Sequence, residues 1–145
     1  MIQRARSASV AVAGREIARI GQGLLVLLAV AEGDRPADVS RMAKKITELR
    51  IFADTSGRMN LALGEVGGEL LVVSQFTLLA DCRKGRRPSF AGAASPAEGR
   101  RLYEEFLREI ARISAAPVRC GEFGAEMLVA LENDGPVTLV LDTLA

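Results

Sequence analysis

Histidine and tryptophan are both absent from this chain of 145 residues, and aromatic side chains make up only 4% of it. Without histidine, neither a Ser-His-Asp nor a Cys-His catalytic arrangement is possible, and the commonest general base and the usual nitrogen ligand of zinc are missing. Any enzymatic proton transfer must therefore use carboxylates, lysine, a hydroxyl group, backbone amides or the substrate itself.

Long apolar runs and a secretory start are also lacking. The longest apolar run, Leu24 to Ala31, has eight residues, whereas a membrane-spanning helix needs about 20. The start, MIQRARSASV, does not have the basic-then-apolar order of a secretory signal. Cys82 and Cys120 form no C-x-x-C pair, so we expect reduced thiols in a cytoplasmic protein without membrane contact.

Charge of one sign is not in excess. The formal net charge is +1, which gives no overall attraction for polyanions, so any contact with nucleic acid must come from a local patch. Hydrophobic residues make up 49% of the chain, and its length suffices for one domain with a substantial core. We predict a single domain that spans residues 1–145.

Apolar periodicity and turn residues predict more strands than helices. Alternation predicts a hairpin with strands Ser7 to Val12 and Glu16 to Ile20. Apolar residues at spacings of three and four predict a helix from about Pro36 to Arg50, with Asp34 as its cap. A second helix is predicted from Ser95-Pro96 to a point before Pro117.

The remaining predicted strands lie within GLLVLLAVAEGD, RIFADTSGRMN and ELLVVSQFTLLAD, around a turn at Gly121 to Gly124, and at Val137 to Leu141. Strands and helices do not alternate regularly. The sequence therefore predicts an α+β fold whose mixed β-sheets form a partly closed barrel with two main helices.

The polar stretch Ser74-Gln75-Phe76-Thr77 ends one of the apolar strands. Three of its four side chains can form hydrogen bonds, and loops at strand ends often carry functional groups. The alternative is a strand end whose polar side chains bind nearby backbone. The pattern alone favours this structural interpretation.

A basic loop, RKGRR, places Arg83, Lys84, Arg86 and Arg87 within five positions. Such a loop suits contacts with phosphate groups. The alternative is a solvated surface, which the lack of interleaved aromatic residues slightly favours. Phe90 follows the loop and could fold its ring back onto it.

Other residue types give no clear site. Asp54, Asp81 and Asp142 lie near predicted strand ends, and each is a candidate general base, but their spacing distinguishes none of them. The glycines near Gly64 to Gly68 match neither G-x-G-x-x-G nor a P-loop. We expect neither a metal ion nor a cofactor.

Asn133-Asp134-Gly135-Pro136 is a dense cluster of turn-forming residues before an apolar stretch. Glycine lets another group approach the backbone closely, and an X-Pro bond is cis in about 5–6% of folded cases. The simpler interpretation is an ordinary turn with a trans bond, in which Asp134 is a turn residue.

Stretches along nearly the whole chain match one family pattern: QRARSASV, GLLVLLAVAEGD, KKITELRIFAD, GRMNLAL, GGELLVVSQFTLLAD, RKGRRPSF, GEFGAEM and NDGPVTLVLDT. In these stretches the chain resembles the D-aminoacyl-tRNA deacylases of the bacterial and eukaryotic type, the D-Tyr-tRNA deacylase family. SQFT and NDGPVT are that family's signature motifs, and both are intact and in order. Cys82 departs from the threonine or other small residue that the family often has there.

The resemblance implies a homodimer with a barrel-like α+β fold and an active site at the subunit interface. It implies hydrolysis of the ester between a D-amino acid and the 3′-terminal adenosine of tRNA, which releases the amino acid and free tRNA. Glycine mischarged on alanine tRNA is expected to be removed as well. The glycine-proline bond is expected to be cis and inserted into the partner subunit's site.

The resemblance also assigns roles to residues. Ser74, Gln75, Phe76 and Thr77 are the expected catalytic segment, with backbone N–H groups near Phe76 and Thr77 as an oxyanion hole. The expected residues for substrate binding and chiral selection are Asn133, Gly135, Pro136, Val137, Thr138, Arg4, Phe123 and Met127. Arg83, Lys84, Arg86 and Arg87 are expected to contact tRNA phosphates.

The lack of histidine is compatible with this reaction, because an aminoacyl ester is already activated. In a scheme similar to the family's, the terminal 2′-hydroxyl of tRNA helps to activate the attacking water. Thr77 is an alternative nucleophile, although no base stands beside it in the sequence. A fixed Gly135 carbonyl could bind the substrate amino group so that an L side chain collides with the motif, while glycine is accepted.

Two other functions remain open at this point. One is the editing of L-seryl esters, as in a similar domain attached to archaeal threonyl-tRNA synthetases, against which the intact SQFT and GPVT motifs argue. The other is a nucleic-acid-binding protein that shares the fold without catalysing a reaction.

Overall fold

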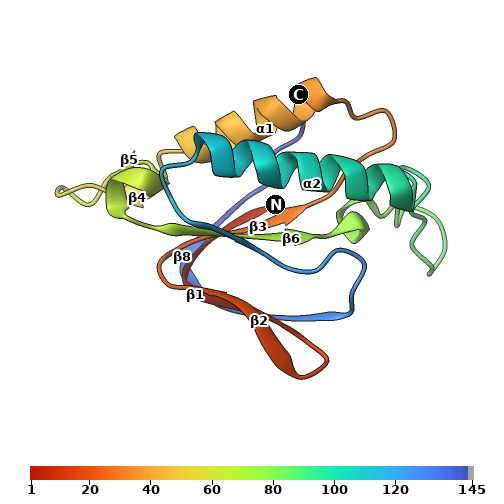
Figure 1. Cartoon of the computed structure of the whole chain (residues 1–145), viewed down its shortest axis with the longest axis horizontal. Coiled ribbons are helices and arrows are strands. Elements are labelled where there is room, and N and C mark those ends of the chain that lie inside the picture. The colour runs from red at the N-terminus through yellow and green to blue at the C-terminus, as the bar shows by residue number, and fades with distance from the viewer. Residues whose placement is uncertain (144–145) are drawn as a thin grey trace.

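The computed structural model describes residues 1–143 and contains one six-stranded sheet with two helices over one face (Figure 1). The strands are β1 (Ile2–Val12), β2 (Arg15–Ile20), β3 (Gly23–Leu28), β6 (Glu69–Ser74), β7 (Val118–Cys120) and β8 (Met127–Leu139). Their order is β2-β1-β3-β6-β7, and β8 pairs with β1. β4 (Phe52–Ala53) and β5 (Met59–Leu61) form a separate two-stranded sheet.

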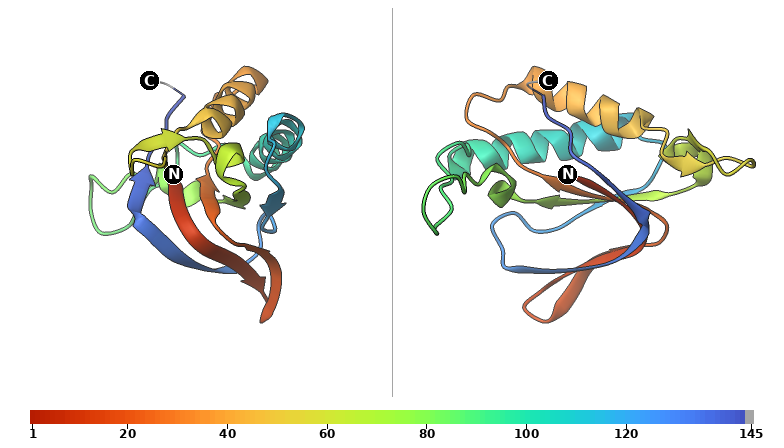
Figure 2. Two further views of the ribbon diagram at one scale, coloured as in Figure 1. Left: turned by 90° about the vertical axis from the view of Figure 1, so that its left-hand side faces the viewer. Right: turned by 180° about the vertical axis from the view of Figure 1, so that it is seen from behind.

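The sheet is mixed, because β3 and β6 run parallel while β1 pairs antiparallel with β2, β3 and β8. Alternate residues of β3 and β6 fall into two separate apolar clusters, as the two-residue period of a strand requires. Leu24 and Leu70 belong to the cluster under the helices. Leu25 and Leu71 belong to the second cluster, which β1 and β2 enclose on the other face as the sheet curls (Figure 2). The predicted α+β fold with a partly closed barrel is therefore confirmed.

The helices are α1 (Pro36–Glu48) and α2 (Pro96–Ile113). Each buries the predicted face. Val39, Ala43 and Ile46 of α1 and Leu102, Phe106 and Ile110 of α2 are buried. Ser95 caps α2 as predicted, since its side chain accepts a hydrogen bond from the Glu98 N–H.

The predicted cap of α1 is wrong. Asp34 accepts a hydrogen bond from the Ala31 N–H at 2.8 Å and so stabilises the turn before the helix. Arg35 occupies the capping position, and its N–H donates to the Asp38 carboxylate at 3.0 Å. An aspartate can satisfy backbone donors on either side of itself, so sequence alone does not choose between a cap and a turn.

The predicted turn at Asn133–Pro136 and the separate last strand are also wrong, because β8 continues through this stretch. Gln3 pairs with Thr138 and Ala5 pairs with Asn133, so the four residues 134–137 of β8 face Arg4 alone. The cluster of turn-forming residues is thus a large, irregular β-bulge. Glycine and proline mark bulges as well as turns, which explains the error.

Candidate functional site

The stretch Ser74 to Thr77 lies where β6 ends. Ser74 pairs with Leu28 at the end of β3, and the Gln75 N–H donates to the Leu28 carbonyl at 2.7 Å. The chain then enters a short 3-10 helix, η2 (Phe76–Leu79). Because β3 and β6 are parallel, both strand ends open at the same edge of the sheet, which is where loops carry functional groups.

The backbone N–H groups of Phe76 and Thr77 lie in the first turn of η2. The first N–H groups of a helix have no acceptor within it, and among residues 1–143 neither group has another acceptor. The Thr77 hydroxyl accepts a hydrogen bond from the Gln75 side-chain amide. Two backbone donors are thus available at the end of β6, while the Thr77 hydroxyl is engaged.

A cavity of about 590 Å³ lies beside Ser74, Gln75 and Phe76, between the ends of β3 and β6, the start of α2 and the start of β8. It is lined by Leu28, Val30, Val73, Ser74, Gln75, Phe76, Phe90, Ala93, Ala94, Ser95, Pro96, Gly99, Phe123, Gly124, Ala125, Met127 and Val129. None of these lining residues carries a charge. The predicted residues Phe123 and Met127 are among them, whereas Thr77 is not.

Sequence reasoning missed the side of this cavity formed by Leu28, Val30, Ala93 and the first turn of α2. Apolar strand ends and a helix start have no chemical signature of their own, so only the fold brings them to the site. The ring of Phe90 does not fold back onto the basic loop, as the sequence had suggested it could. Its ring packs edge-on against the Phe76 ring at 5.1 Å and lines the cavity.

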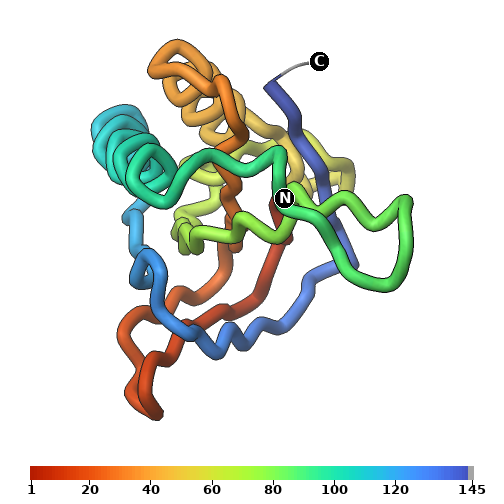
Figure 3. Tube along the Cα trace, turned by 90° about the vertical axis from the view of Figure 1, so that its right-hand side faces the viewer, coloured from red at the N-terminus to blue at the C-terminus, as the bar shows by residue number. Residues whose placement is uncertain are grey.

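The basic loop lies next to this cavity. Asp81 and Ser89 exchange two backbone hydrogen bonds that close the loop between them, and it projects from the body of the molecule (Figure 3). Arg83 is held by the Asp81 carboxylate at 2.7 Å, which keeps the pKa of Asp81 below its ordinary value. The exposed side chains of Lys84, Arg86 and Arg87 leave the loop positively charged.

Arg4 holds the bulge at Gly135 and Pro136 in place. The Arg4 Nε donates to the Asp134 carbonyl at 3.2 Å and lies 3.4 Å from its carboxylate, and Nη1 donates to the Ile51 carbonyl at 2.6 Å. Gly135 has φ +124°, and the Gly135–Pro136 bond is cis. Both residues are exposed. The bulge is therefore a fixed projection of backbone groups.

The other predicted residues of this motif flank the bulge. Asn133 pairs with Ala5 and is exposed, while Val137 packs against the core under the helices. The Thr138 hydroxyl donates to the Gln3 side chain across the strand pair. These contacts anchor both ends of the bulge to β1.

The two motifs do not meet within one chain. Met127, at the start of β8, lines the cavity, but Gly135 lies eight residues further along that strand. At about 3.3 Å per residue this is a separation of roughly 25 Å along the strand. In Figure 1, β6 ends and α2 begins at the same end of the molecule, and β8 runs from that end to the opposite one before it turns back towards the C-terminus.

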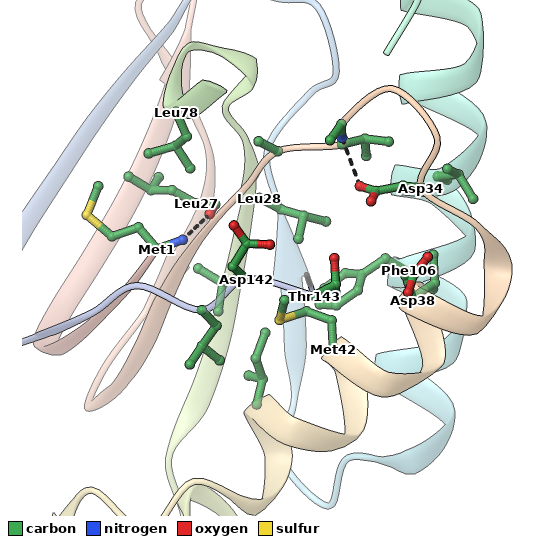
Figure 4. Close-up of a pocket in the computed structure, with 18 of the residues that line it drawn as sticks. Met1, Leu27, Leu28, Asp34, Asp38, Met42, Leu78, Phe106, Asp142 and Thr143 are labelled. Atoms are coloured by element: carbon green, nitrogen blue, oxygen red, sulfur yellow. Dashed lines mark hydrogen bonds between the residues drawn. The ribbon is translucent and has the colours of Figure 1, made fainter. Parts of the chain in front are cut away.

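The carboxylates considered as bases lie elsewhere. Asp54 accepts hydrogen bonds from the Ser56 hydroxyl and from the Ser56 and Arg58 N–H groups, which hold its pKa below the ordinary value. Asp142 lines a second, apolar cavity of about 330 Å³ between α1, the end of β3 and the last described residues (Figure 4). Asp34 and Asp38 also border that cavity. Within residues 1–143, no group of three possible ligands could hold a metal ion.

Neither described helix is both long and apolar enough to cross a bilayer.

Comparison with known proteins gives one consistent family. The family model described as D-Tyr-tRNA(Tyr) deacylase matches residues 1–142. Proteins named D-aminoacyl-tRNA deacylase from Syntrophobacter fumaroxidans and Thermosipho melanesiensis are 54% and 51% identical to this chain over 143 residues. These matches cover 99% of this chain and 95% of each relative.

Two solved structures are similar to the chain. One, named c-Myc DNA Unwinding Element Binding Protein, has a TM-score of 0.92 at 37% identity and covers 97% of this chain and 95% of that one. Another, described as a probable eukaryotic D-amino acid tRNA deacylase, has a TM-score of 0.74 at 19% identity and covers 93% of each chain. The second likeness concerns the fold alone.

Proposed function

The chain belongs to the D-Tyr-tRNA(Tyr) deacylase family and is on that ground a D-aminoacyl-tRNA deacylase, and we propose that the cavity beside Ser74 is where it hydrolyses the ester. The products are a free D-amino acid and tRNA. The observation that carries this proposal is the uncharged cavity lined by Ser74, Gln75 and Phe76, because the N–H of Phe76 and that of the next residue, Thr77, have no acceptor within residues 1–143.

The proposed reaction begins with attack of water on the ester carbonyl carbon. The N–H groups of Phe76 and Thr77 stabilise the negative charge that develops on the carbonyl oxygen, and each such donor is worth about 10²–10³ in rate. The 2′-hydroxyl of the terminal ribose assists removal of the water proton. The bond to the 3′-oxygen then breaks, and that oxygen takes up a proton.

A reaction assisted by the substrate matches the residues present. None of the residues that line the cavity can act as a general base at neutral pH. The Thr77 hydroxyl is engaged by Gln75 and has no base beside it. An activated ester needs only positioning and electrostatic help, which backbone groups supply.

Chiral selection is proposed to come from Gly135 and Pro136 of a second copy of the chain. The motif is exposed and rigidly held by Arg4, yet it lies far along β8 from its own cavity. A homodimer could bring it to the partner's cavity, where the Gly135 carbonyl would accept a hydrogen bond from the substrate amino group. An L side chain would then collide with the motif, whereas glycine, including glycine on alanine tRNA, would be accepted.

The basic loop is proposed to contact the tRNA backbone. Phe90 connects the loop to the cavity, so tRNA whose 3′ end enters the cavity passes close to Lys84, Arg86 and Arg87. Lysine and arginine contacts with phosphates supply affinity without reading sequence. Such an enzyme would act in proofreading of translation, in the cytoplasm.

One assay tests the activity and its selectivity. The purified protein is incubated with D-Tyr-tRNA, L-Tyr-tRNA, Gly-tRNA-Ala and L-Ser-tRNA, and loss of each ester is followed. We expect turnover of the D-Tyr and glycyl esters and little loss of the two L-esters above the uncatalysed rate. Preferential loss of the L-seryl ester would replace the proposal with an L-seryl editing function.

A second candidate is nucleic-acid binding without catalysis. The similar structure named c-Myc DNA Unwinding Element Binding Protein and the basic loop favour it. This candidate predicts binding of nucleic acid with no turnover of any of the four esters. The same assay therefore decides between the two functions.

A further inference from the structure

Two of the aromatic side chains in the wall of the cavity lie outside the helices and strands, Phe90 and Phe123. Phe123 lies in the connection between β7 and β8, between Gly121 and Gly124. Its ring lines the cavity. Because glycines leave a loop conformationally free, the position of this ring depends on what contacts it.

The first half of α2 provides those contacts. The ring of Tyr103 packs against the Phe123 ring, with the two ring centres 5.6 Å apart. Tyr103 is itself fixed, since it is 3% exposed and its hydroxyl donates to the Val72 carbonyl at 3.1 Å. Gly99 also lies beside the ring and has no side chain. A Cβ added at Gly99 would lie 3.6 Å from the tip of the Phe123 ring.

Arg100 also contacts the ring of Phe123. The guanidinium carbon lies 4.8 Å from the centre of the Phe123 ring, a cation–π distance. The same guanidinium lies 3.4 Å from the Phe123 carbonyl, to which Nη2 donates. Its nearest acid, Glu104, is 3.8 Å away. Arg100 therefore contacts both the ring and the backbone carbonyl of Phe123.

We propose that Arg100 is a positioning residue that fixes Phe123 in the cavity wall against the aminoacylated 3′ end of the tRNA. This inference rests on the proposed function of the cavity. Arg100 does not line the cavity itself, so it acts through Phe123. Without it, the ring would move within a glycine-flanked loop, and substrate binding would weaken more than the chemical step.

The first measurement compares Arg100→Ala with Arg101→Ala. Arg101 is the neighbouring arginine on α2, is similarly exposed, and pairs with Glu98 and Glu105 rather than with the cavity wall. We expect Arg100→Ala to raise KM for D-Tyr-tRNA about two- to fivefold, the size of one exposed cation–π contact, with a smaller change in kcat. Arg101→Ala controls for the loss of one positive charge.

A second measurement separates positioning from phosphate contact. With D-tyrosyl-adenosine, which has no phosphate group, a positioning role predicts the same rise in KM as with tRNA. A phosphate contact would instead affect only the tRNA substrate and would lower its salt dependence. Arg100→Lys should recover part of the loss, since lysine keeps the charge but lacks the planar fork that reaches ring and carbonyl together.

A double-mutant cycle tests the route through Phe123. In the Phe123→Ala background, Arg100→Ala should have no further effect on KM, because the side chain that it holds is gone. Independent, multiplying effects of the two substitutions would overturn the proposal, as would equal KM values for Arg100→Ala and Arg101→Ala. Failure of the unaltered protein to turn over D-Tyr-tRNA would overturn the proposed function, and this inference with it.

Discussion

At the scale of single residues, the candidate site supplies backbone groups rather than side-chain bases. The cavity is lined by uncharged residues, and the polar side chains among them belong to Ser74, Gln75 and Ser95. Hydrogen bonds within their own turn and loop lower the pKa of Asp54 and of Asp81, and neither carboxylate lines the cavity. Predictions about the reaction must therefore be tested by removing backbone donors as well as side chains.

Replacing Phe76 by proline removes one proposed oxyanion donor. Proline lacks an N–H and is tolerated at the first position of a helix, and Gln75 has φ −146° and ψ 73°, outside the helical region. We expect kcat to fall about 10²–10³-fold relative to Phe76→Ala, which keeps the N–H. Single-turnover hydrolysis of D-Tyr-tRNA measures both. Equal rates would remove this N–H from the reaction.

The Thr77→Ala variant tests the alternative covalent route. The Thr77 hydroxyl accepts a hydrogen bond from Gln75 and is not part of the cavity wall, so its loss should reduce kcat by no more than about tenfold, the order of one neutral hydrogen bond. If the Thr77 hydroxyl were the nucleophile, its removal would abolish turnover. Complete loss of turnover, with tRNA binding and thermal stability unchanged, would contradict the proposed substrate-assisted reaction.

Gly135→Ala tests the bulge. A Cβ at this position would lie 2.8 Å from Val137 Cγ2 and 3.1 Å from Arg4 Nη2, at a φ of +124° that side chains rarely adopt. The displaced carbonyl would lose a charge-assisted hydrogen bond, so we expect kcat/KM for D-Tyr-tRNA to fall roughly 10- to 100-fold. Gly14→Ala, at φ +75° with no atom within 4 Å, is the control for backbone strain. The same D-to-L rate ratio as in the unaltered protein would argue against the motif.

At the scale of elements, the sequence predicts what local periodicity controls. The buried faces of α1 and α2 follow from apolar spacing, and the hairpin of β1 and β2 follows from alternation and a turn. The bulge in β8 could not be predicted, because pairing of Asn133 with Ala5 and of Thr138 with Gln3 joins residues about 130 positions apart. The cavity is missed in part for the same reason.

The basic loop is an element whose charges are not equivalent. Arg83 is paired with Asp81, so Arg86 and Arg87 are the arginines that we expect to contact phosphates. The double variant Arg86→Ala/Arg87→Ala should weaken tRNA binding, and the slope of log K against log salt should decrease by roughly 1.5, or about 0.7–0.9 for each contact. Filter binding at several salt concentrations measures the slope.

The matched control is Arg108→Ala/Arg112→Ala, which removes the same charge near the far end of α2. A helix of this length separates its ends by roughly 25 Å, so these arginines are remote from the cavity. If both double variants change the slope equally, the loop has no special place in tRNA binding.

At the scale of the whole molecule, the cavity beside Ser74 lies at the start of β8, whereas Gly135 and Pro136 lie near its other end. The outer edge of β8 has no partner strand among the described residues. Leu128 and Val140 are 74% and 80% exposed. Long unpaired edges and exposed apolar side chains are where a second copy can pack, which is compatible with the symmetric dimer that the family resemblance implies.

Mixing two defective variants tests whether the motif acts on its partner. Phe76→Pro damages the cavity and leaves the bulge intact, while Gly135→Ala does the reverse. After unfolding and refolding an equal mixture, half of the dimers are mixed, and each mixed dimer has one site with both parts intact. We therefore expect about a quarter of the unaltered activity, well above the average of the separate variants. No recovery, with mixed dimers shown by native mass spectrometry, would mean that each bulge serves its own chain.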